Sequence, residues 1–251
     1  MFQEDVRKMA NAAKGKVDLL NSHPGRYLIA SMLAGLFVGF AICLIFTIQT
    51  YIPGTPTKVL MGFCFTIALT LVVIAGAELF TGNNMVMTLG LAKKTVTLPD
   101  TLKLWAVCWI GNLLGSIVCG ALFVGGGFTA GDAAEVFTKA ALAKAEIAFL
   151  PLVFRGILCN ILVCLAVWGS GRIQDGGGKI LYITLCIATF VIIGFEHSVA
   201  NMTLFSIGLM AKSSVPFTFV GAVHNLVAVT IGNMIGGICF VGLPYALIAK
   251  E

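Results

Sequence analysis

The sequence predicts an all-α integral membrane protein with six transmembrane helices, of which the second and the fifth are broken. Hydrophobic residues make up 59% of the 251 residues and charged residues only 11%, whereas about a quarter of an ordinary soluble domain is charged. The apolar residues gather in six long segments, and two of these segments have polar interruptions at matching places. One transmembrane domain over residues 1–251 is therefore expected.

The six apolar segments cover residues 27–50, 59–92, 101–124, 149–169, 180–211 and 217–248. A helix rises about 1.5 Å per residue and the hydrocarbon core is about 30 Å thick, so the second and fifth segments are too long for one unbroken crossing. Each contains a polar stretch where a break is expected. These stretches are "GAELFTGNN" at 76–84 and "GFEHSVANM" at 194–202.

The two halves of the chain resemble each other. Glu78 in the first interruption corresponds to Glu196 in the second, and "IGNLLG" at 110–115 corresponds to "IGNMIG" at 231–236. The two predicted units are residues 27–124 and residues 149–248. Because each unit has three spans, the units must have opposite orientations in the membrane. Such a 3+3 inverted repeat with broken helices predicts a substrate path near the middle of the bilayer, between the halves.

Residues 1–22 precede the first span and predict an amphipathic helix on the cytoplasmic side. Apolar residues recur at helical spacing in it, at Phe2, Val6, Met9, Ala13, Val17 and Leu20. Anchoring at the lipid headgroups is the simpler role for such a helix, and gating a pore is the alternative. The stretch lacks an apolar core followed by a small-residue cleavage site, so no removable signal peptide is expected.

Lysine and arginine residues indicate the orientation of the chain. If both termini are cytoplasmic, eleven basic residues, among them Lys250, lie inside, and four lie outside: Lys58, Lys139, Lys144 and Lys212. The positive-inside rule favours this orientation in the cell (inner or plasma) membrane. The net charge of +5 thus reflects membrane topology, and no pattern of basic and aromatic residues indicates a nucleic-acid partner.

The glycines and cysteines are expected to be packing residues. Glycines four residues apart let helices approach closely, and such pairs occur at Gly35 and Gly39, Gly111 and Gly115, and Gly232 and Gly236. All eight cysteines fall within the spans and none forms a CxxC pair, so we expect no disulfide, metal site or cofactor. The sequence also lacks HExxH or another cofactor motif, and an enzyme is not expected.

Acidic and amide side chains at the two interruptions need partners inside the protein, because a non-helical backbone in lipid leaves N–H and C=O groups unpaired. Suitable partners for these groups are Glu78, Glu196, Asn83, Asn84 and Asn201. The preferred interpretation makes the two glutamates structural, capping freed amides at the breaks and at the N-termini of the half-helices that follow. In the alternative interpretation the two glutamates carry protons. Either role demands burial inside the bundle.

His197 has no counterpart in the first half, where the matching positions are Leu79, Phe80 and Thr81. A lone histidine in an apolar segment is usually a packed core residue. Its position at a helix break that faces another break favours a functional role instead. An imidazole gains or loses a proton near physiological pH, so it could attract an anion or protonate a weak base.

Three long motifs in this order resemble the formate/nitrite transporter family over essentially the whole chain: "AELFTGNNM" at 77–85, "RGILCNILVCLAVW" at 155–168 and "GFEHSVANM" at 194–202. The resemblance implies an aquaporin-like fold and a homopentamer with one pore through each protomer. It also implies passage of small monovalent anions such as formate, nitrite or hydrosulfide.

The resemblance also assigns roles to residues. His197 resembles the central pore histidine, Thr81 its hydroxyl partner on the facing broken helix, and Asn160 the pore asparagine of the fourth span. The resemblance assigns the apolar constrictions around that histidine to Leu79, Leu69, Phe65, Phe190 and Val163. Lys144 falls where the family keeps a lysine that attracts anions to the outer vestibule, and a solvated loop lysine is the alternative for this position.

Two other transport functions are also considered. An aquaporin-like channel for neutral solutes would share the broken helices, but it should have Asn-Pro-Ala at both breaks, and neither break contains proline. A proton-coupled symporter of the same anions would use the same residues.

Overall fold

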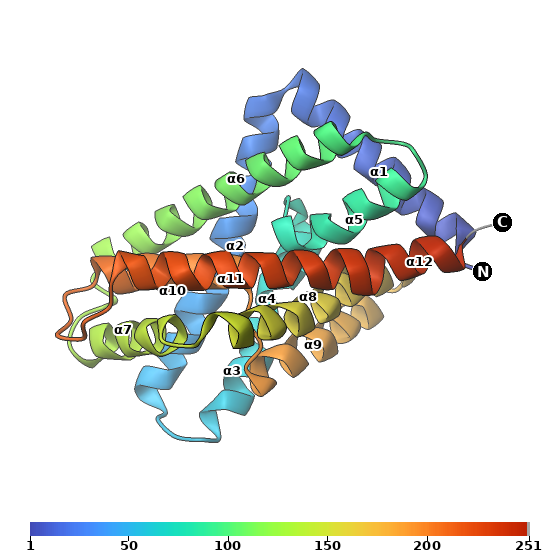
Figure 1. Ribbon diagram of the computed structural model, residues 1–251. Coiled ribbons are helices and arrows are strands. Elements are labelled where there is room, and N and C mark those ends of the chain that lie inside the picture. Colours follow the sequence, from blue (N-terminus) through green and yellow to red (C-terminus); the bar gives the residue numbers. More distant parts are fainter. Residues whose placement is uncertain (250–251) are drawn as a thin grey trace.

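The computed structural model describes residues 1–249 as a bundle of helices (Figure 1). Within these residues, six helical segments are long and apolar enough to cross a membrane, as the sequence predicts. They are Pro24–Tyr51, Thr57–Gly76, Leu98–Gly125, Phe149–Arg172, Gly176–Ile193 and Phe219–Ile248. Lys250, which entered the charge count above, lies outside the described residues.

Four of the spans are single helices: α2 (Pro24–Tyr51), α6 (Leu98–Gly125), α8 (Phe149–Arg172) and α9 (Gly176–Ile193). The second span is divided into α3 (Thr57–Phe65), α4 (Ile67–Leu71) and the π-helical segment η1 (Val72–Gly76). The last span is divided into α11 (Phe219–Gly237), the π-helical segment η2 (Ile238–Gly242) and α12 (Leu243–Ile248).

The two predicted breaks are confirmed. Three residues separate the end of η1 at Gly76 from the start of α5 (Phe80–Ala92), and four separate the end of α9 at Ile193 from the start of α10 (Ser198–Met210). Each break starts at a glycine with a positive φ, 84° at Gly76 and 91° at Gly194. Other residues adopt this backbone conformation at a cost in energy, so glycine is the residue that permits each turn.

The half-helices α5 and α10 lie inside the bundle. Every residue from Phe80 to Gly90 and from Ser198 to Gly208 is buried. Their amide and hydroxyl side chains therefore face protein rather than lipid, as the burial argument requires.

Small residues bring the long helices together in two pairs. A Cβ added at Gly115 of α6 would collide with the Met32 carbonyl of α2, and one added at Gly236 of α11 would collide with the Ile157 carbonyl of α8. The predicted role of the spaced glycines in close helix packing is confirmed at these positions.

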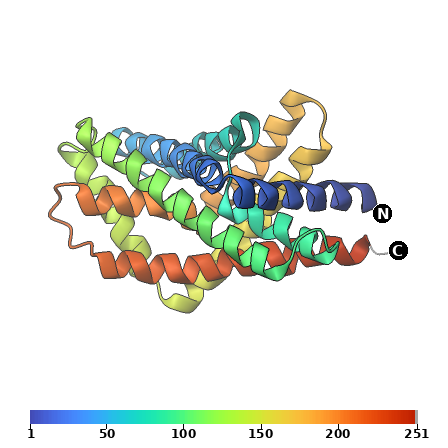
Figure 2. The ribbon, with the colours of Figure 1, turned by 90° about the horizontal axis from the view of Figure 1, so that it is seen from above.

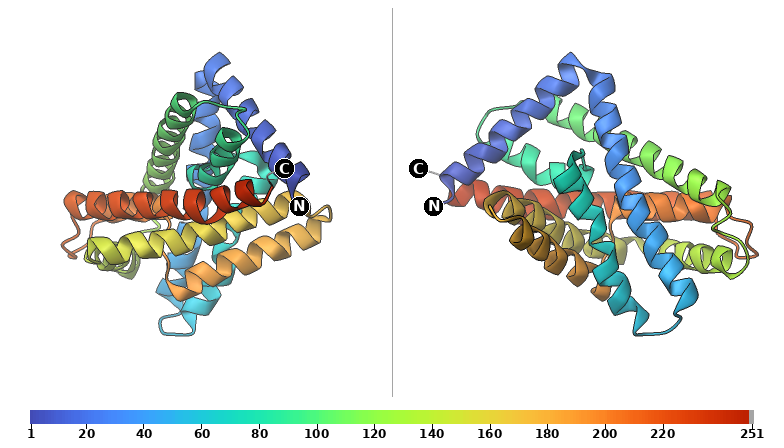
Figure 3. Two further views of the ribbon diagram at one scale, coloured as in Figure 1. Left: turned by 45° about the vertical axis from the view of Figure 1, so that its right-hand side comes forward. Right: turned by 180° about the vertical axis from the view of Figure 1, so that it is seen from behind.

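Helix α1 (Gln3–Ser22) is amphipathic, as predicted, but its apolar face is covered by protein. Its buried residues are Val6, Ala10, Ala13, Val17 and Leu20, and it packs on α5, α2 and α6. Figure 3 shows α1 and α2 meeting at a sharp corner, which lies at His23. The expectation that this face anchors the chain at the headgroups is wrong, because α5 and α2 already bury it.

Helix α7 (Asp132–Ala145) was not among the predicted elements. Its buried residues Ala134, Phe137, Thr138 and Ala141 follow helical spacing, but the segment is too short and too polar to stand out as a span. Figures 1 and 2 place both ends of the described chain at one end of the bundle, and in Figure 1 α7 lies at the opposite end. Helices α1 and α7 thus occupy the two ends of the molecule.

Candidate functional site

His197 lies at the second break, immediately before α10, and its side chain is only 5% exposed. Its Nδ1 accepts a hydrogen bond from the Ala200 amide at 3.1 Å, so the imidazole caps the N-terminus of α10. Its Nε2 lies 3.0 Å from Oγ1 of Thr81, near the start of α5. The side chain therefore joins the two half-helices at the centre of the bundle.

The hydrogen bonds of His197 define its protonation in this arrangement. A backbone amide can only donate, so Nδ1 is the bare nitrogen and the proton of the neutral ring lies on Nε2, directed at Thr81. A second proton on Nδ1 would displace the Ala200 amide and place positive charge at the positively polarised end of α10. His197 therefore presents a neutral N–H donor to the centre of the protein.

A small apolar chamber lies against His197. Its volume is about 10 Å³, which is about the room that one water needs. It is lined by all five residues that the family resemblance assigns to the constrictions, namely Phe65, Leu69, Leu79, Val163 and Phe190, and also by Val38, Ala68 and Ile187. The Phe190 ring stacks on the imidazole at 6.1 Å with an interplanar angle of 17°. The structure thus brings the predicted constriction residues together around the histidine.

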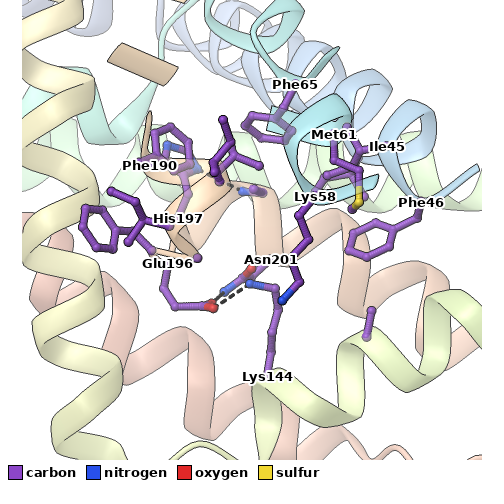
Figure 4. Close-up of a pocket in the computed structure, with 18 of the residues that line it drawn as sticks. Ile45, Phe46, Lys58, Met61, Phe65, Lys144, Phe190, Glu196, His197 and Asn201 are labelled. Atoms are coloured by element: carbon purple, nitrogen blue, oxygen red, sulfur yellow. Dashed lines mark hydrogen bonds and ion pairs between the residues drawn. The ribbon is translucent and has the colours of Figure 1, made fainter. Parts of the chain in front are cut away.

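A much larger cavity, of about 540 Å³, lies on the side of α7 and reaches His197 and Phe190. Figure 4 shows Lys144, Glu196 and Asn201 on one side of this cavity and Lys58 running into it from the other. Lys144 Nζ lies 2.6 Å from Glu196 Oε1. Lys144 therefore lines the cavity that reaches His197. It lies on α7 rather than in a loop, and it is paired with a carboxylate.

The glutamates at the breaks bond side chains rather than backbone amides. Glu78 accepts bonds from Lys16 Nζ at 2.5 Å, Tyr27 Oη at 3.2 Å and Asn83 Nδ2 at 3.0 Å. Glu196 accepts from Lys144 and, at 2.6 Å, from Asn201 Nδ2. The expectation that these two carboxylates cap freed amides is wrong, because a lysine from a peripheral helix occupies each carboxylate.

Two asparagines that the site prediction missed satisfy the backbone at the breaks. Asn112 of α6 accepts from the Phe80 amide at 2.9 Å and donates to the carbonyls of Ser31 and Glu78. Asn233 of α11 makes the matching set of bonds at the second break. The repeated "IGN" of residues 110–112 and 231–233 was the signal that could have found both residues.

Asn233 accepts from the Ser198 amide at 3.0 Å and donates to the carbonyls of Gly156 and Glu196. The first amide of each half-helix is therefore held by an asparagine from a neighbouring span. Both asparagines are fully buried, and their bonds replace the water that lipid excludes from the broken backbone.

Asn160 supports the first break rather than lining either cavity described above. Its Nδ2 lies 3.1 Å from the Thr81 carbonyl, 2.6 Å from the Asn233 carbonyl and 3.1 Å from Oδ1 of Asn84. Asn84 therefore links α5 to α8. Through these bonds Asn160 fixes the position of the threonine that faces His197.

Two cysteines also contact the first break. Cys108 Sγ lies 3.3 Å from the Glu78 carbonyl, and Cys164 Sγ lies 3.5 Å from the Thr81 carbonyl. The expectation of purely apolar packing is too simple for these two thiols, because each donates a weak hydrogen bond to a backbone carbonyl. These carbonyls belong to Glu78 in the break and to Thr81 in the first turn of α5.

These features define a class of protein: a membrane-spanning bundle with two facing helix breaks, a buried imidazole between them and a charged cavity leading to it. Residues 3–247 match the family described as Formate/nitrite transporter. The chain is 40% identical over 249 residues to the nitrite transporter NirC of Salmonella typhimurium, covering 98% of this chain and 91% of that protein.

Two solved structures of channels have the same fold as this chain. An FNT family ion channel superimposes with a TM-score of 0.95 at 38% identity, with complete coverage of both chains. A pentameric formate channel with formate bound superimposes with a TM-score of 0.79 at 30% identity, over 90% of this chain and 97% of that one. The protein belongs to the formate/nitrite transporter family.

Proposed function

We propose that this protein is a transmembrane channel for small monovalent anions of weak acids, of the formate and nitrite class. The observation that carries the proposal is the contact of His197 Nε2 with Thr81 Oγ1 at 3.0 Å, buried between two helix breaks and bordered by an apolar chamber. Relatives that carry nitrite and formate support the same substrates for this chain.

The chemistry of the site fits such substrates. A bare anion loses its hydration in an apolar constriction, which is costly unless a hydrogen bond replaces part of it. The Nε2–H group of a neutral His197 offers that bond, and hydrogen bonds to charged groups contribute about 1.5–3 kcal/mol. The conjugate acid of a weak-acid anion is neutral and loses less, so sharing a proton with His197 or its water network would ease passage further.

The size of the chamber supports selection of small substrates. Its volume of about 10 Å³ admits little more than one water-sized group, so bulkier carboxylates must displace Leu79 or Phe190 to pass. Nitrite and formate are compact, and hydrosulfide is the further candidate substrate of this size.

The assembly and orientation are part of the proposal. A homopentamer with one pore in each protomer is supported by the pentameric structural relative. Exposed apolar side chains such as Leu122, Leu181 and Leu185 then face lipid or a neighbouring subunit.

The lysine and arginine distribution supports a location in the cell (inner) membrane with both termini in the cytoplasm. Within one channel domain, the matched contacts of Glu78 with Lys16 and of Glu196 with Lys144 support an inverted repeat, and no enzymatic activity is proposed.

The test replaces His197 by Phe in protein reconstituted into liposomes. Loss of one charge-assisted donor should lower formate and nitrite flux about tenfold or more, because about 1.4 kcal/mol corresponds to a factor of ten. The matched control is His224→Phe. His224 bonds the Ile147 carbonyl at 3.0 Å and does not line the chamber, so its replacement should leave the flux near the wild-type value.

Three results would contradict the proposal. Wild-type flux and selectivity in the His197→Phe protein would remove the histidine from the pathway. Glycerol permeability comparable to formate permeability in the wild-type protein would indicate a channel for neutral solutes. Flux that is strictly driven by an imposed pH gradient, at constant anion gradient, would indicate proton-coupled symport.

A further inference from the structure

The 540 Å³ cavity on the side of α7, which is the outer cavity in the proposed orientation, carries more positive charge than its ion pair accounts for. Among the described residues that line it, Lys58, Lys144 and Arg155 are cationic and Glu196 is the one carboxylate. Lys144 and Glu196 are in contact at 2.6 Å, so together they contribute no net charge, and their combined field falls off faster than that of a single ion. Lys58 and Arg155 are the surplus.

Lys58 is the second residue of α3 and is exposed. Within residues 1–249, no carboxylate lies within ion-pair distance of its ammonium group, and Figure 4 shows the side chain extending from α3 into the cavity. A lysine ammonium is a compact charge on a flexible stem. Lys58 can therefore follow an ion across the mouth of the cavity.

Arg155 lies in the second turn of α8, inside a membrane-spanning helix, where a charge facing lipid is strongly disfavoured. It lines the cavity instead, and in the described part of the chain its guanidinium has no carboxylate partner. Its own carbonyl accepts the Glu196 amide at 3.3 Å, which holds this turn of α8 beside the second break. At the first break the carbonyl in this role belongs to Ala30, so the arginine is particular to the outer end.

We propose that Lys58 and Arg155 form the anion-capture site of the outer cavity, and that Lys144 is a positioning residue that holds Glu196 and the second break. The proposal rests on the proposed function, and its ligand is a small anion with two oxygens, such as formate or nitrite. The planar fork of an arginine matches two such oxygens. Two unpaired cations raise the local anion concentration at the mouth, which increases the entry rate.

The experiment measures formate uptake into liposomes as a function of formate concentration for Lys58→Gln, Arg155→Gln and the double variant. At about 0.01 M ionic strength the Debye length is about 30 Å. Under these conditions each single variant should raise the half-saturating concentration about threefold, and the double variant about tenfold, with the maximal rate retained. Lys212→Gln is the control, because it removes one exposed lysine charge that does not line the cavity.

Raising the salt concentration distinguishes an electrostatic effect on anion capture from a structural defect. At about 1 M of a salt with a bulky anion, the Debye length is about 3 Å, so the variants and the wild type should converge. Arg155→Lys, which keeps the charge and loses the fork, should recover the salt-sensitive part of the effect. Lys144→Gln should instead lower thermal stability and the maximal rate, and salt should not correct either defect.

The opposite pattern would overturn the proposal. If the Lys58 and Arg155 variants keep the wild-type half-saturating concentration while Lys144→Gln alone raises it in a salt-sensitive way, capture belongs to Lys144. Failure of the proposed function looks different, because the wild-type protein itself would then carry neither formate nor nitrite in these liposomes.

Discussion

The two helix breaks use the same supports but differ in the residue that they present to the centre. Each begins at a glycine with a positive φ, Gly76 or Gly194. Each places a glutamate whose amide bonds a carbonyl of a preceding span and whose carboxylate binds a lysine from a peripheral helix. Directly after the glutamate, however, the first break has Leu79 and the second has His197.

This difference distinguishes the residues that support the broken backbone from those proposed to act on the anion. The supports satisfy backbone and charge wherever a helix breaks in lipid, and that requirement is the same in both halves. Leu79 contributes an apolar wall, whereas His197 contributes a hydrogen-bond donor and also caps its half-helix. In the proposed function, one wall and one donor facing each other form a selective passage, which two copies of either would not provide.

The largest effect is expected at the asparagines that both breaks share. Asn112→Ala and Asn233→Ala each remove three hydrogen bonds and leave buried backbone groups without partners. Each should cost about 3–5 kcal/mol of stability, measured as a lower thermal midpoint in detergent. Asn21→Ala, on the exposed end of α1, is the control. Similar losses at both breaks are expected, and a normal midpoint for either variant would show that its break has other support.

The two lysine–glutamate pairs should differ in strength. The Glu196 side chain is 3% exposed and the Glu78 side chain is 16% exposed, and Glu78 has Tyr27 and Asn83 as further donors. Removing a cation leaves an uncompensated buried carboxylate. We therefore expect Lys144→Met to cost about 3 kcal/mol and Lys16→Met about 1 kcal/mol. The thermal midpoints compare the two, and a greater loss for Lys16→Met would reverse this ranking.

A smaller effect on stability is expected at His197, where two variants distinguish the capping role of Nδ1 from the donor role of Nε2. Asn is a good N-cap, so His197→Asn should keep the bond to the Ala200 amide and the wild-type stability, while its shorter side chain loses the contact with Thr81. His197→Phe loses the cap as well and should cost about 1 kcal/mol. Both variants should lose formate flux. Equal thermal midpoints for the Asn and Phe variants would show that the cap contributes nothing.

The smallest effect concerns the loops that follow the half-helices. After α10, Ser213 and Ser214 bond the Glu135 carboxylate of α7, and these bonds, first that of the Ser214 amide, lower the pKa of Glu135. After α5, the neutral Thr95 hydroxyl bonds the Ala10 carbonyl of α1 at 2.8 Å.

The loop that the Glu135 carboxylate holds should respond to pH. A carboxyl group with a lowered pKa in the folded protein stabilises it above the ordinary pKa, and this contribution is lost as the pH falls through the folded value. Hydrogen exchange of residues 212–218 should therefore increase at acid pH. Exchange of residues 93–96, which precede the Thr97 amide held by the Asp100 carboxylate, should show no matching increase. Glu135→Gln should remove the pH dependence, and an unchanged dependence in that variant would assign it to another group.

The sequence by itself determined the six spans and the two breaks, and it singled out His197 as a candidate functional residue. Lipid offers no hydrogen bonds, so an apolar run must be helical, and a polar interruption within it must be a break with partners inside the protein. These requirements act along a short stretch of chain, so they can be recognised in "GAELFTGNN" and "GFEHSVANM" without knowledge of the rest. The resemblance of these motifs to the family then supplied Thr81 and the constriction residues.

Only the tertiary structure decided which groups satisfy each break. Asn112 lies in an otherwise apolar span 32 residues from the Phe80 amide that it binds, and Lys144 lies 52 residues from Glu196. Helix α7, which brings that lysine to the break, carries too weak an apolar pattern to be recognised alone. A backbone group in lipid demands some partner, and this demand can be read from local sequence. The identity of the partner depends on which helices pack together, and that is a property of the folded chain.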